Sequence, residues 1–473
     1  MRRILQLLVT GLLFVTSCFS QFAPAEWLNH LNQELMPFWN HPGAFGDPKG
    51  DFPAIRCDDG TAVVWTSPCP EVGRNAWLMQ RPRNVVSQSR QVYVYGVAYH
   101  MTGNPEYLRM MKLGVDYLRS QVMDRVNGGI ATNQDARTGA WGPKMEWRNP
   151  QELAYGVLGL AMYYYLTRDA EVLPDIIAVK DHVFARYYDR DAHVIHWLLE
   201  DNGSERAAQR RLVAQLDQMN AYLVLMTPIL PEPLRTQWRD DLEGISLLMI
   251  EKFYSPAENL FFLNANTPND RDLAFAGTDF GHTIKAFWMI RWTAWMRGDV
   301  DLLAFAEANG KRVLERAYLA ESGSWASAIR RGGELDRSKS WWIYAELDQF
   351  AATLSIKDPL MRTKYLAGTY DFWRKYMVDP NFGEVWSTVD GDTFLPVGDL
   401  PKQWPWKNGY HSLEHALIAY ITGAAAEGQP LTLHYGFAVD RRQEDVHPYF
   451  FHGRIANVQA MSGSWAVTFL DVE

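Results

Sequence analysis

Apolar and polar positions follow one another along this chain in a pattern that repeats six times. Each repeat opens with an apolar, aromatic-rich stretch of helical periodicity, passes through a short polar turn and ends in a second, amphipathic stretch. Successive repeats start 59 to 70 residues apart, and the apolar stretches begin near Arg90, Glu152, Asp217, His282, Trp341 and His411. A regular period of this length indicates a repeat architecture.

Each repeat has the length of a helical hairpin, because two helices of about 15 residues with short connections fill one period. One hairpin cannot bury its apolar face alone, so the six hairpins must pack side by side. Closing the ring gives an all-α fold, an (α/α)6 barrel that we expect to span residues 21–427. The first helix of each hairpin then belongs to the inner ring.

The end of the chain, residues 428–473, does not follow the helical pattern of the repeats. Residues 431–437 and 466–470 have the composition of short strands, so we expect a small β-like extension packed on the barrel. A cap is the simpler interpretation of this extension, and an interface is the alternative. Its histidines do not have the spacing of metal ligands: His434, His447 and His452.

The amino-acid composition favours a sugar ligand and argues against a nucleic-acid partner. The chain is 47% hydrophobic with 19 Trp, 22 Tyr and 22 Phe, which is too apolar for disorder and rich in rings that can line a sugar-binding pocket. Its net charge is −9, and we find no basic run beyond the N-terminal segment. This pattern argues against a nucleic-acid partner, and solubility alone accounts for the acidity.

The N-terminus, residues 1–20, has the pattern of an export signal. A positive start, Met1-Arg2-Arg3, precedes an apolar stretch over residues 4–15 that is too short to span a membrane. Residues 15–18 resemble a bacterial lipobox ending in Cys18, whereas residues 18–20 also suit an ordinary signal peptidase. We therefore expect an exported protein, either periplasmic or held to a membrane only by an N-terminal lipid.

Two further cysteines, Cys57 and Cys69, lie in one Gly/Asp/Pro-rich loop before the first repeat. In an oxidising compartment they could pair. Two free thiols are an equal alternative, because spacing in the sequence fixes no geometry.

The starts of the inner helices carry polar side chains that should converge on one mouth of the barrel. A ring of titratable groups beside tryptophan is typical of an active site, although each group alone is also explained as a helix cap. The ring consists of Arg90, Glu152, Asp217, His282, His411 and, one turn into the fifth inner helix after Trp341 and Trp342, Glu346.

Two of these helix starts match each other closely. Residues 278–285 and 407–414 each place an Asp or Asn three residues ahead of a His, with a Gly between them and a charge three residues after the His. The positive end of the helix dipole disfavours protonation there, so we expect His282 and His411 to stay neutral near pH 7. A neutral imidazole can act as a base, whereas a purely structural histidine is the alternative.

The charges that follow the two histidines have opposite signs. Lys285 lies one helical turn after His282, and Glu414 lies one turn after His411. We therefore expect a Lys285–Glu414 ion pair across the barrel interior.

With these motifs the sequence resembles the N-acylglucosamine 2-epimerase superfamily, which includes mannose isomerases and cellobiose 2-epimerases. The resemblance runs from about residue 90 to residue 420. It rests on the order and spacing of residues 90–93, Phe280-Gly281-His282, residues 339–346, residues 379–386, and Lys407 with Tyr410-His411.

The resemblance implies that His282 and His411 are an acid/base pair. It also implies that Arg90 and Glu346 hold sugar hydroxyls. Moving or inverting the hydrogen at C2 of an aldose needs a base, a second acid/base group and a cation or donor for the enediolate. No metal, nucleotide or other cofactor is then required. The residues expected to bind the reducing sugar or oligosaccharide are Arg90, Glu152, Asp217, Trp341, Trp342, Glu346 and Trp386.

The chain also departs from the pattern of the superfamily. Asp217 and Asn220 stand where relatives usually carry His and Glu, and Lys285 and Glu414 reverse the charges found there. We interpret the reversed pair as compensation, and the departures leave the identity of the substrate open.

Three function classes follow. The first is a cofactor-independent epimerase or aldose–ketose isomerase acting on a reducing mono- or disaccharide. The second is an exported glycoside hydrolase or polysaccharide lyase on the same barrel. The third is a carbohydrate-binding protein without catalysis. Retention of both histidines favours the first class, whereas the second would use carboxylates from Glu152, Asp217, Asp279 and Glu346.

Overall fold

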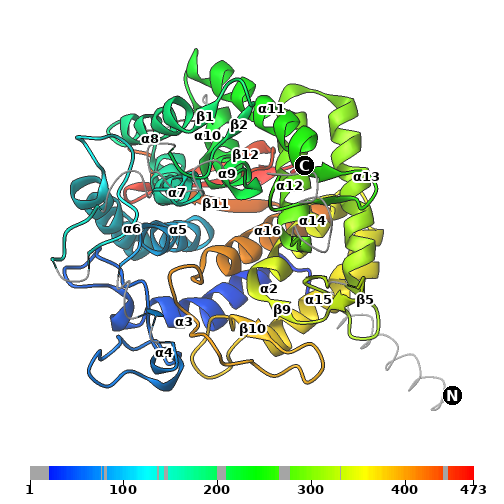
Figure 1. The fold of residues 1–473 in the computed structure, drawn as a ribbon, viewed down its shortest axis with the longest axis horizontal. Helices are drawn as coiled ribbons and strands as arrows, with labels where there is room; N and C mark the ends of the chain where they lie inside the picture. Colours follow the sequence, from blue (N-terminus) through cyan, green and yellow to red (C-terminus); the bar gives the residue numbers. More distant parts are fainter. Residues whose placement is uncertain are drawn as a thin grey trace.

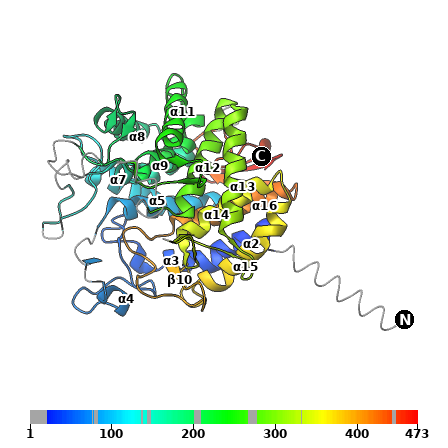
Figure 2. The same cartoon turned by 45° about the vertical axis from the view of Figure 1, so that its right-hand side comes forward.

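The computed structural model describes residues 21–75, 77–78, 83–135, 138–142, 148–199, 209–265, 277–330, 332–439, 441 and 446–473. Its helices form a closed double ring, which confirms the predicted (α/α)6 barrel (Figures 1 and 2). Consecutive inner helices contact one another, and the last inner helix contacts the first. The inner ring consists of α5 (Val85–Thr102), α7 (Pro150–Thr167), α9 (Leu212–Gln218) continued by η7 (Met219–Leu223) and α10 (Val224–Met226), α12 (Phe280–Arg297), α14 (Trp341–Ser355) and α16 (Tyr410–Ala426).

Five outer helices follow their inner helices as predicted, but the sixth does not. The chain leaves α16 through Gly428, whose φ of 62° is left-handed, and enters a strand. The N-terminal helices occupy the sixth outer place and pack the buried Trp27 and Leu31 toward α16. Five hairpins and one closing pair therefore complete the ring. The outer ring consists of α6 (Pro105–Tyr117) with η4 (Leu118–Val122), α8 (Leu173–Arg186), α11 (Leu234–Phe253), α13 (Val300–Ala317), η10 (Arg362–Leu366) with α15 (Ala367–Phe372) and η11 (Trp373–Met377), and α2 (Pro24–Asn29) with η1 (His30–Leu35) and α3 (Met36–Trp39).

Side-chain caps fix where several inner helices begin. Asn84, Asn149 and Asp279 each accept a hydrogen bond from a backbone N–H in the first turn of the helix that follows. Since the inner helices run side by side in one direction, their N-terminal ends meet at one end of the barrel.

Shorter elements lie in the connections between the helices. They are η2 (Pro42–Ala44), α4 (Pro70–Gly73), η8 (Thr227–Ile229) and the strand pairs β1 (Tyr188–Asp189) with β2 (Val194–Ile195), β3 (Tyr254–Ser255) with β4 (Leu260–Phe261), β5 (Tyr318–Leu319) with β6 (Ser324–Trp325), β7 (Ala328–Ile329) with β8 (Leu335–Asp336), and β9 (Lys339–Ser340) with β10 (Thr388–Val389).

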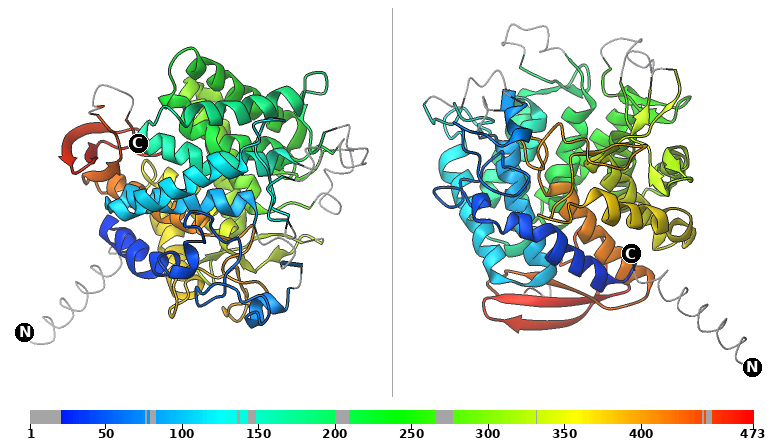
Figure 3. Two further views of the ribbon diagram at one scale, coloured as in Figure 1. Left: turned by 90° about the vertical axis from the view of Figure 1, so that its left-hand side faces the viewer. Right: turned by 90° about the horizontal axis from the view of Figure 1, so that it is seen from below.

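The C-terminal residues form an antiparallel sheet against the other end of the barrel (Figure 3). Its strands are β11 (Leu431–Tyr435), β13 (Ser464–Leu470) and β12 (Arg454–Met461), in that order. The two predicted strands correspond to β11 and β13. β12 has no counterpart among the predicted strands, because most of its side chains are exposed and it lacks an apolar alternation.

Cys57 and Cys69 form a disulfide with a Cα–Cα distance of 6.0 Å, which decides between the two alternatives left open by the sequence. Within the described residues, no helix has the length and apolar character needed to cross a membrane. The predicted export signal and Cys18 lie outside the described residues.

Candidate active site

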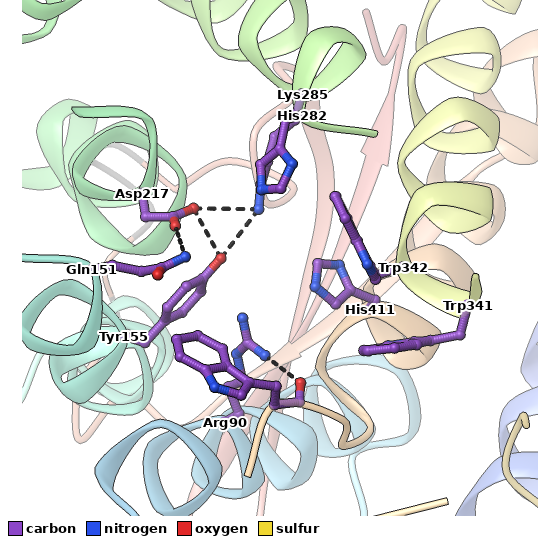
Figure 4. A pocket seen from close by; sticks show the side chains of 10 residues that line it. Arg90, Gln151, Tyr155, Asp217, His282, Lys285, Trp341, Trp342 and His411 are labelled. Atoms are coloured by element: carbon purple, nitrogen blue, oxygen red, sulfur yellow. Dashed lines mark hydrogen bonds and ion pairs between the residues drawn. The ribbon is translucent and has the colours of Figure 1, made fainter. Parts of the chain in front are cut away.

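A cavity of about 220 Å³ opens where the N-terminal halves of the inner helices meet (Figure 4). Side chains from several inner helices point into it, together with one tryptophan from the connection before α16. The lining residues are Arg90, Gln151, Tyr155, Asp217, His282, Lys285, Trp341, Trp342, Trp406 and His411.

His282 is held at the start of α12 by the residue that caps this helix. One carboxylate oxygen of Asp279 accepts a hydrogen bond from the His282 backbone N–H at 2.6 Å, and the other lies 2.6 Å from His282 Nδ1. Burial lowers the pKa of His282, but the charge and the hydrogen bond of Asp279 outweigh burial and raise this pKa above its usual value. The pKa of His282 thus shifts in the direction opposite to that expected from the helix dipole, because the Asp279 carboxylate favours the charged form.

His411, at the start of α16, has the opposite electrostatic environment. Its Nδ1 atom lies 3.4 Å from Oε1 of Glu346. Burial and then the positive charges of Lys285 and Arg90 lower the pKa of His411 well below its usual value. His411 is thus neutral, as the sequence predicted, and burial is the main cause.

Lys285 is buried among acidic and phenolic groups beneath the two histidines. Its Nζ atom lies 3.4 Å from Glu346 Oε1, 3.5 Å from Asp217 Oδ1 and 3.1 Å from the Tyr155 hydroxyl. Burial lowers the pKa of Lys285, but the nearby Tyr155, Glu346 and Asp217 outweigh burial and raise it. Lys285 is therefore a buried cation with two carboxylate partners.

The predicted Lys285–Glu414 ion pair was wrong. Glu414 instead accepts a hydrogen bond from the hydroxyl of Tyr449 at 2.5 Å. Burial and the neighbouring charge of Glu346 raise the pKa of Glu414 to about 8, so Glu414 carries a proton near neutral pH. The charge of Lys285 is balanced by Asp217, which stands where relatives usually have a histidine, and by Glu346.

Asp217 has both carboxylate oxygens occupied. Gln151 donates to one oxygen at 2.8 Å, and the Tyr155 hydroxyl donates to the other at 2.9 Å. Arg90 lies beside this group, with its guanidinium 3.9 Å from the centre of the Tyr155 ring. The Arg90 guanidinium also donates to the backbone carbonyl of Trp406 at 2.8 Å, which fixes its position at the cavity.

Aromatic rings wall the cavity beside the histidines. The Trp342 ring lies 4.6 Å from the His282 ring and 6.1 Å from the His411 ring, measured between centroids. Trp386 is not among the lining residues of this cavity, and its ring lies 5.1 Å from the Lys402 ammonium. Its role in binding sugar stays a prediction.

Two predicted residues, Glu152 and Glu346, do not line the cavity. Glu152 is buried and is not among the lining residues, whereas Gln151 and Tyr155 of the same helix are. Those two residues are one turn apart and share a helix face, a signal in the sequence that charge alone does not reveal. Glu346 lies below the cavity as a partner of Lys285 and His411.

Glu346, His411 and Glu414 each bring one possible ligand atom within 4.8 Å of the others. The ammonium of Lys285 already lies beside Glu346, and Tyr449 already donates to Glu414. A protein cation and a hydroxyl thus account for this grouping, and we assign no metal to it.

A model of the N-acylglucosamine 2-epimerase (GlcNAc 2-epimerase) family matches residues 72–414. The chain belongs to this family. The order of the family motifs along the sequence had led to the same assignment.

Relatives of known name support this membership in the N-acylglucosamine 2-epimerase family. The cellobiose 2-epimerase of Ruminococcus albus is 24% identical over 404 residues, which cover 82% of this chain and 96% of that protein. The structure of a cellobiose 2-epimerase from Bacillus thermoamylovorans is 18% identical with a TM-score of 0.69 and covers 84% of this chain and 98% of that one. The structure of a D-mannose isomerase is 19% identical with a TM-score of 0.68 and covers 85% and 99%. At these identities the two structures show a shared fold.

Proposed function

We propose that this protein is a cofactor-independent carbohydrate epimerase or aldose–ketose isomerase that moves a proton at C2 of a reducing sugar. One observation carries the proposal: two histidines with opposite protonation tendencies face the same cavity. His411 is buried and neutral, whereas Asp279 favours the charged form of His282. A base and an acid side by side are the pair that this chemistry requires.

In the proposed reaction the open-chain sugar places its C2–H bond beside His411. Nδ1 of His411 faces Glu346, so Nε2 is the nitrogen available to remove the C2 proton. His282, whose Nδ1 is bonded to Asp279, donates a proton from Nε2 to the carbonyl oxygen at C1. In isomerisation, His411 returns its proton to C1 while His282 takes the proton from the C2 hydroxyl. In epimerisation, the enediol turns its opposite face toward His411, which returns the proton to C2 while His282 takes back the proton from the oxygen at C1. In both cases each histidine regains its starting state.

Two cations stabilise the negative charge that develops on the sugar oxygens. Arg90 and Lys285 line the cavity, and neighbouring groups hold both in place. Preorganised positive groups in a site that excludes water lower the energy of an enediolate more than they would in bulk solvent. Every group that this route uses is therefore a side chain of this chain.

The cavity sets a limit on the substrate. Its volume of about 220 Å³ is below the ~300–1,000 Å³ of pockets that enclose drug-sized ligands, so it holds one sugar ring. In a disaccharide the reducing ring occupies the cavity and the second ring lies outside it. Relatives named cellobiose 2-epimerase and D-mannose isomerase suggest disaccharides and hexoses as the first substrates to test.

The hydrolase or lyase alternative is less well supported. Asp217 would be its prominent carboxylate, but both oxygens of Asp217 accept hydrogen bonds, and Lys285 lies 3.5 Å away. A carboxylate held in this way is a poor nucleophile or base. A carbohydrate-binding protein without catalysis would have no need of two histidines in opposite protonation states.

Deuterium exchange tests the proposal. The purified protein is incubated with mannose, glucose or cellobiose in D2O, and NMR measures deuterium at C2 together with the products. His411→Asn and His282→Asn should each lower the exchange rate about 10²–10⁴-fold, whereas Asp217→Asn should lower it less. His415→Asn is a matched control, because His415 is buried on the same helix and contacts Asp348 at 3.0 Å instead of the cavity. If Asp217→Asn is inactive and His411→Asn keeps most of its activity, the proposal is wrong.

We further propose that the protein acts outside the cytoplasm, either free in the periplasm or tethered through a lipid on Cys18. The N-terminal pattern carries this proposal. Mass spectrometry of the mature protein tests it. A chain that begins at a lipid-modified Cys18 supports the anchor, one that begins at Gln21 supports the free form, and one that keeps Met1 contradicts export.

A further inference from the structure

A second cavity, of about 240 Å³, lies where the C-terminal extension packs on the barrel. Its walls come from η8, the first turns of α11, the last turn of α12 and the segment between β11 and β12. We call this cavity the basal pocket. The side chains that matter most below are Arg235, Arg239, Trp295, Met296, Val446 and His447.

The basal pocket is separate from the proposed active site. Trp295 and His282 belong to the same helix, α12, and a helical rise of about 1.5 Å per residue places them about 20 Å apart. The pocket therefore lies toward the end of the barrel that the C-terminal sheet covers (Figure 3). Val446 and His447 also lie beyond residue 414, where the match to the family model ends, so the extension is needed to form the pocket.

Arg239 brings a positive charge to the basal pocket. Its guanidinium has no hydrogen-bond or ion-pair partner among the described residues, and its Nε atom is buried. The acids near it on α11 act elsewhere, because Asp240 and Glu243 each lie 2.7 Å from Arg297. Arg235, one helical turn before Arg239, adds a second positive charge to the lining. A guanidinium in this state is suited to pair with a carboxylate or a phosphate group.

His447 offers polar atoms that no described group uses. Its side chain is buried, and neither Nδ1 nor Nε2 has a hydrogen-bond partner among the described residues. Burial and then the charges of His452 and Arg168 lower the pKa of His447 to about 3, so the ring is neutral near pH 7. A neutral imidazole has one N–H donor and one acceptor nitrogen. An anion can accept from the donor, and a hydroxyl group can donate to the acceptor.

The rest of the wall is largely apolar. The Trp295 ring lies 4.0 Å from the His452 ring between centroids, and Met296 and Val446 lie beside them in the lining. Rings and aliphatic groups of this kind pack against the C–H groups of a sugar. The volume is close to that of the active-site cavity, about 220 Å³, so the basal pocket also holds a single sugar ring.

We propose that the basal pocket is a second ligand site that binds an acidic sugar, which is a hydroxylated ring with one carboxylate or phosphate group. Arg239 pairs with the acidic group, His447 forms hydrogen bonds with the ligand, and the side of the pocket around Trp295 packs against the ring. The two cavities share no lining residue among those described, so the inference does not depend on the proposed reaction. It gives the C-terminal extension a role in binding, beyond the cap expected from the sequence.

Isothermal titration calorimetry on the full chain tests the proposal. The probes are glucuronate and glucose 6-phosphate, and glucose is the uncharged control. We expect one equivalent of at least one acid to bind about 10-fold or more tightly than glucose, because a charge-assisted hydrogen bond is about twice as strong as a neutral one. The acid that binds more tightly identifies the acidic group. Inorganic phosphate is the fourth probe, and it should bind more weakly than the preferred acid because it lacks the sugar ring.

Variants assign the binding to one of the two cavities. Arg239→Gln should weaken binding of the acid about 10-fold or more, and Arg239→Lys should weaken it less because the charge remains. Arg297→Gln is the matched control, since it removes the same charge from a guanidinium that Asp240 and Glu243 already neutralise. It should change the affinity by less than about two-fold. Trp342→Ala alters the active-site cavity and should also leave this affinity unchanged.

Three results would overturn the proposal. The first, which needs no variant, is that neither acid binds more tightly than glucose or inorganic phosphate. The second is that Trp342→Ala loses the acid while Arg239→Gln keeps it, because the acid then binds in the active-site cavity. The third concerns Glu444 and Asp445, which precede Val446 in the sequence and lie outside the described residues. Binding that appears only in a Glu444→Gln/Asp445→Asn variant would mean that acids of this chain exclude the ligand.

Discussion

Nδ1 of His282 lies 2.6 Å from Oδ2 of Asp279, and this contact shifts the pKa of His282 in the direction opposite to the pKa shift of His411. Asp279 both caps α12 and raises the pKa of His282, whereas burial and the neighbouring cations lower the pKa of His411. The residue that starts the helix therefore also tunes the proposed acid.

Replacing Asp279 by Asn should change the pH dependence of the reaction. Asn remains a good helix cap, so the variant removes mainly the charge that favours protonated His282. Activity that needs protonated His282 is lost as pH rises through its pKa. Because the variant lowers this pKa, the alkaline limb of the kcat/KM profile should move to lower pH. Asp299→Asn is the matched control, since Asp299 caps outer helix α13 in the same way. An unshifted alkaline limb in Asp279→Asn would contradict the role of His282 as the acid.

Arg90 should act mainly on the chemical step. Its guanidinium is fixed by the Trp406 carbonyl and by the Tyr155 ring, and lysine cannot reproduce this planar, stacked geometry. Arg90→Lys should lower kcat about 10²–10³-fold, the usual effect of losing one preorganised donor. Arg291→Lys is the control, because Arg291 is also buried on an inner helix and lies 4.8 Å from the Trp292 ring, away from the cavity. Equal effects of the two substitutions would assign Arg90 a purely structural role.

Trp342 and Trp386 should differ in their effect on substrate binding. Trp342 lines the cavity beside His282, whereas Trp386 packs against Lys402. An aromatic wall contributes about 1 kcal/mol or more to binding, so Trp342→Ala should raise KM about five-fold or more. Trp386→Ala should leave KM within two-fold. Steady-state kinetics on the same sugar measures both, and a larger effect of Trp386→Ala would support the subsite role that the sequence suggested for it.

The parts of the fold that the sequence predicted well are those with a local cause. Aromatic-rich helical periodicity and polar helix starts place the inner ring, because a helix that is apolar on every side must be buried. The sixth outer helix could not be found in the same way. Sequence order suggested that it should follow α16, but ring closure lets Trp27 and Leu31 near the N-terminus fill that place.

The candidate site was predictable as a set of residues but not as a set of contacts. His282 and His411 stood out because their contexts match. The partner of Lys285 depends instead on how each helix is rotated about its own axis, which brings Asp217 and Glu346 to Lys285 and leaves Glu414 to Tyr449. Tyr449 lies outside the repeat period, so no feature of the six repeats pointed to it.

The ion pair between Lys285 and Asp217 should contribute measurably to the free energy of unfolding. Removing one partner of a buried ion pair leaves an uncompensated charge and typically costs about 3–5 kcal/mol. Lys285→Met should therefore lower the free energy of unfolding by about this amount, because Asp217 and Glu346 then lose their cation. Asp217→Asn should cost less, since Glu346 still lies 3.4 Å from Lys285.

A double-mutant cycle isolates the interaction between the two side chains. The Lys285→Met/Asp217→Asn double variant should be more stable than the sum of the single effects predicts, by about 1 kcal/mol or more, because the second substitution removes a charge that the first left unpaired. Urea unfolding of the four proteins measures this coupling. The same cycle between Lys285→Met and Glu414→Gln is the comparison, and it should give a smaller coupling because Glu414 is protonated near neutral pH and bonded to Tyr449. A larger coupling for Glu414 than for Asp217 would mean that Glu414, and not Asp217, is the main partner of Lys285.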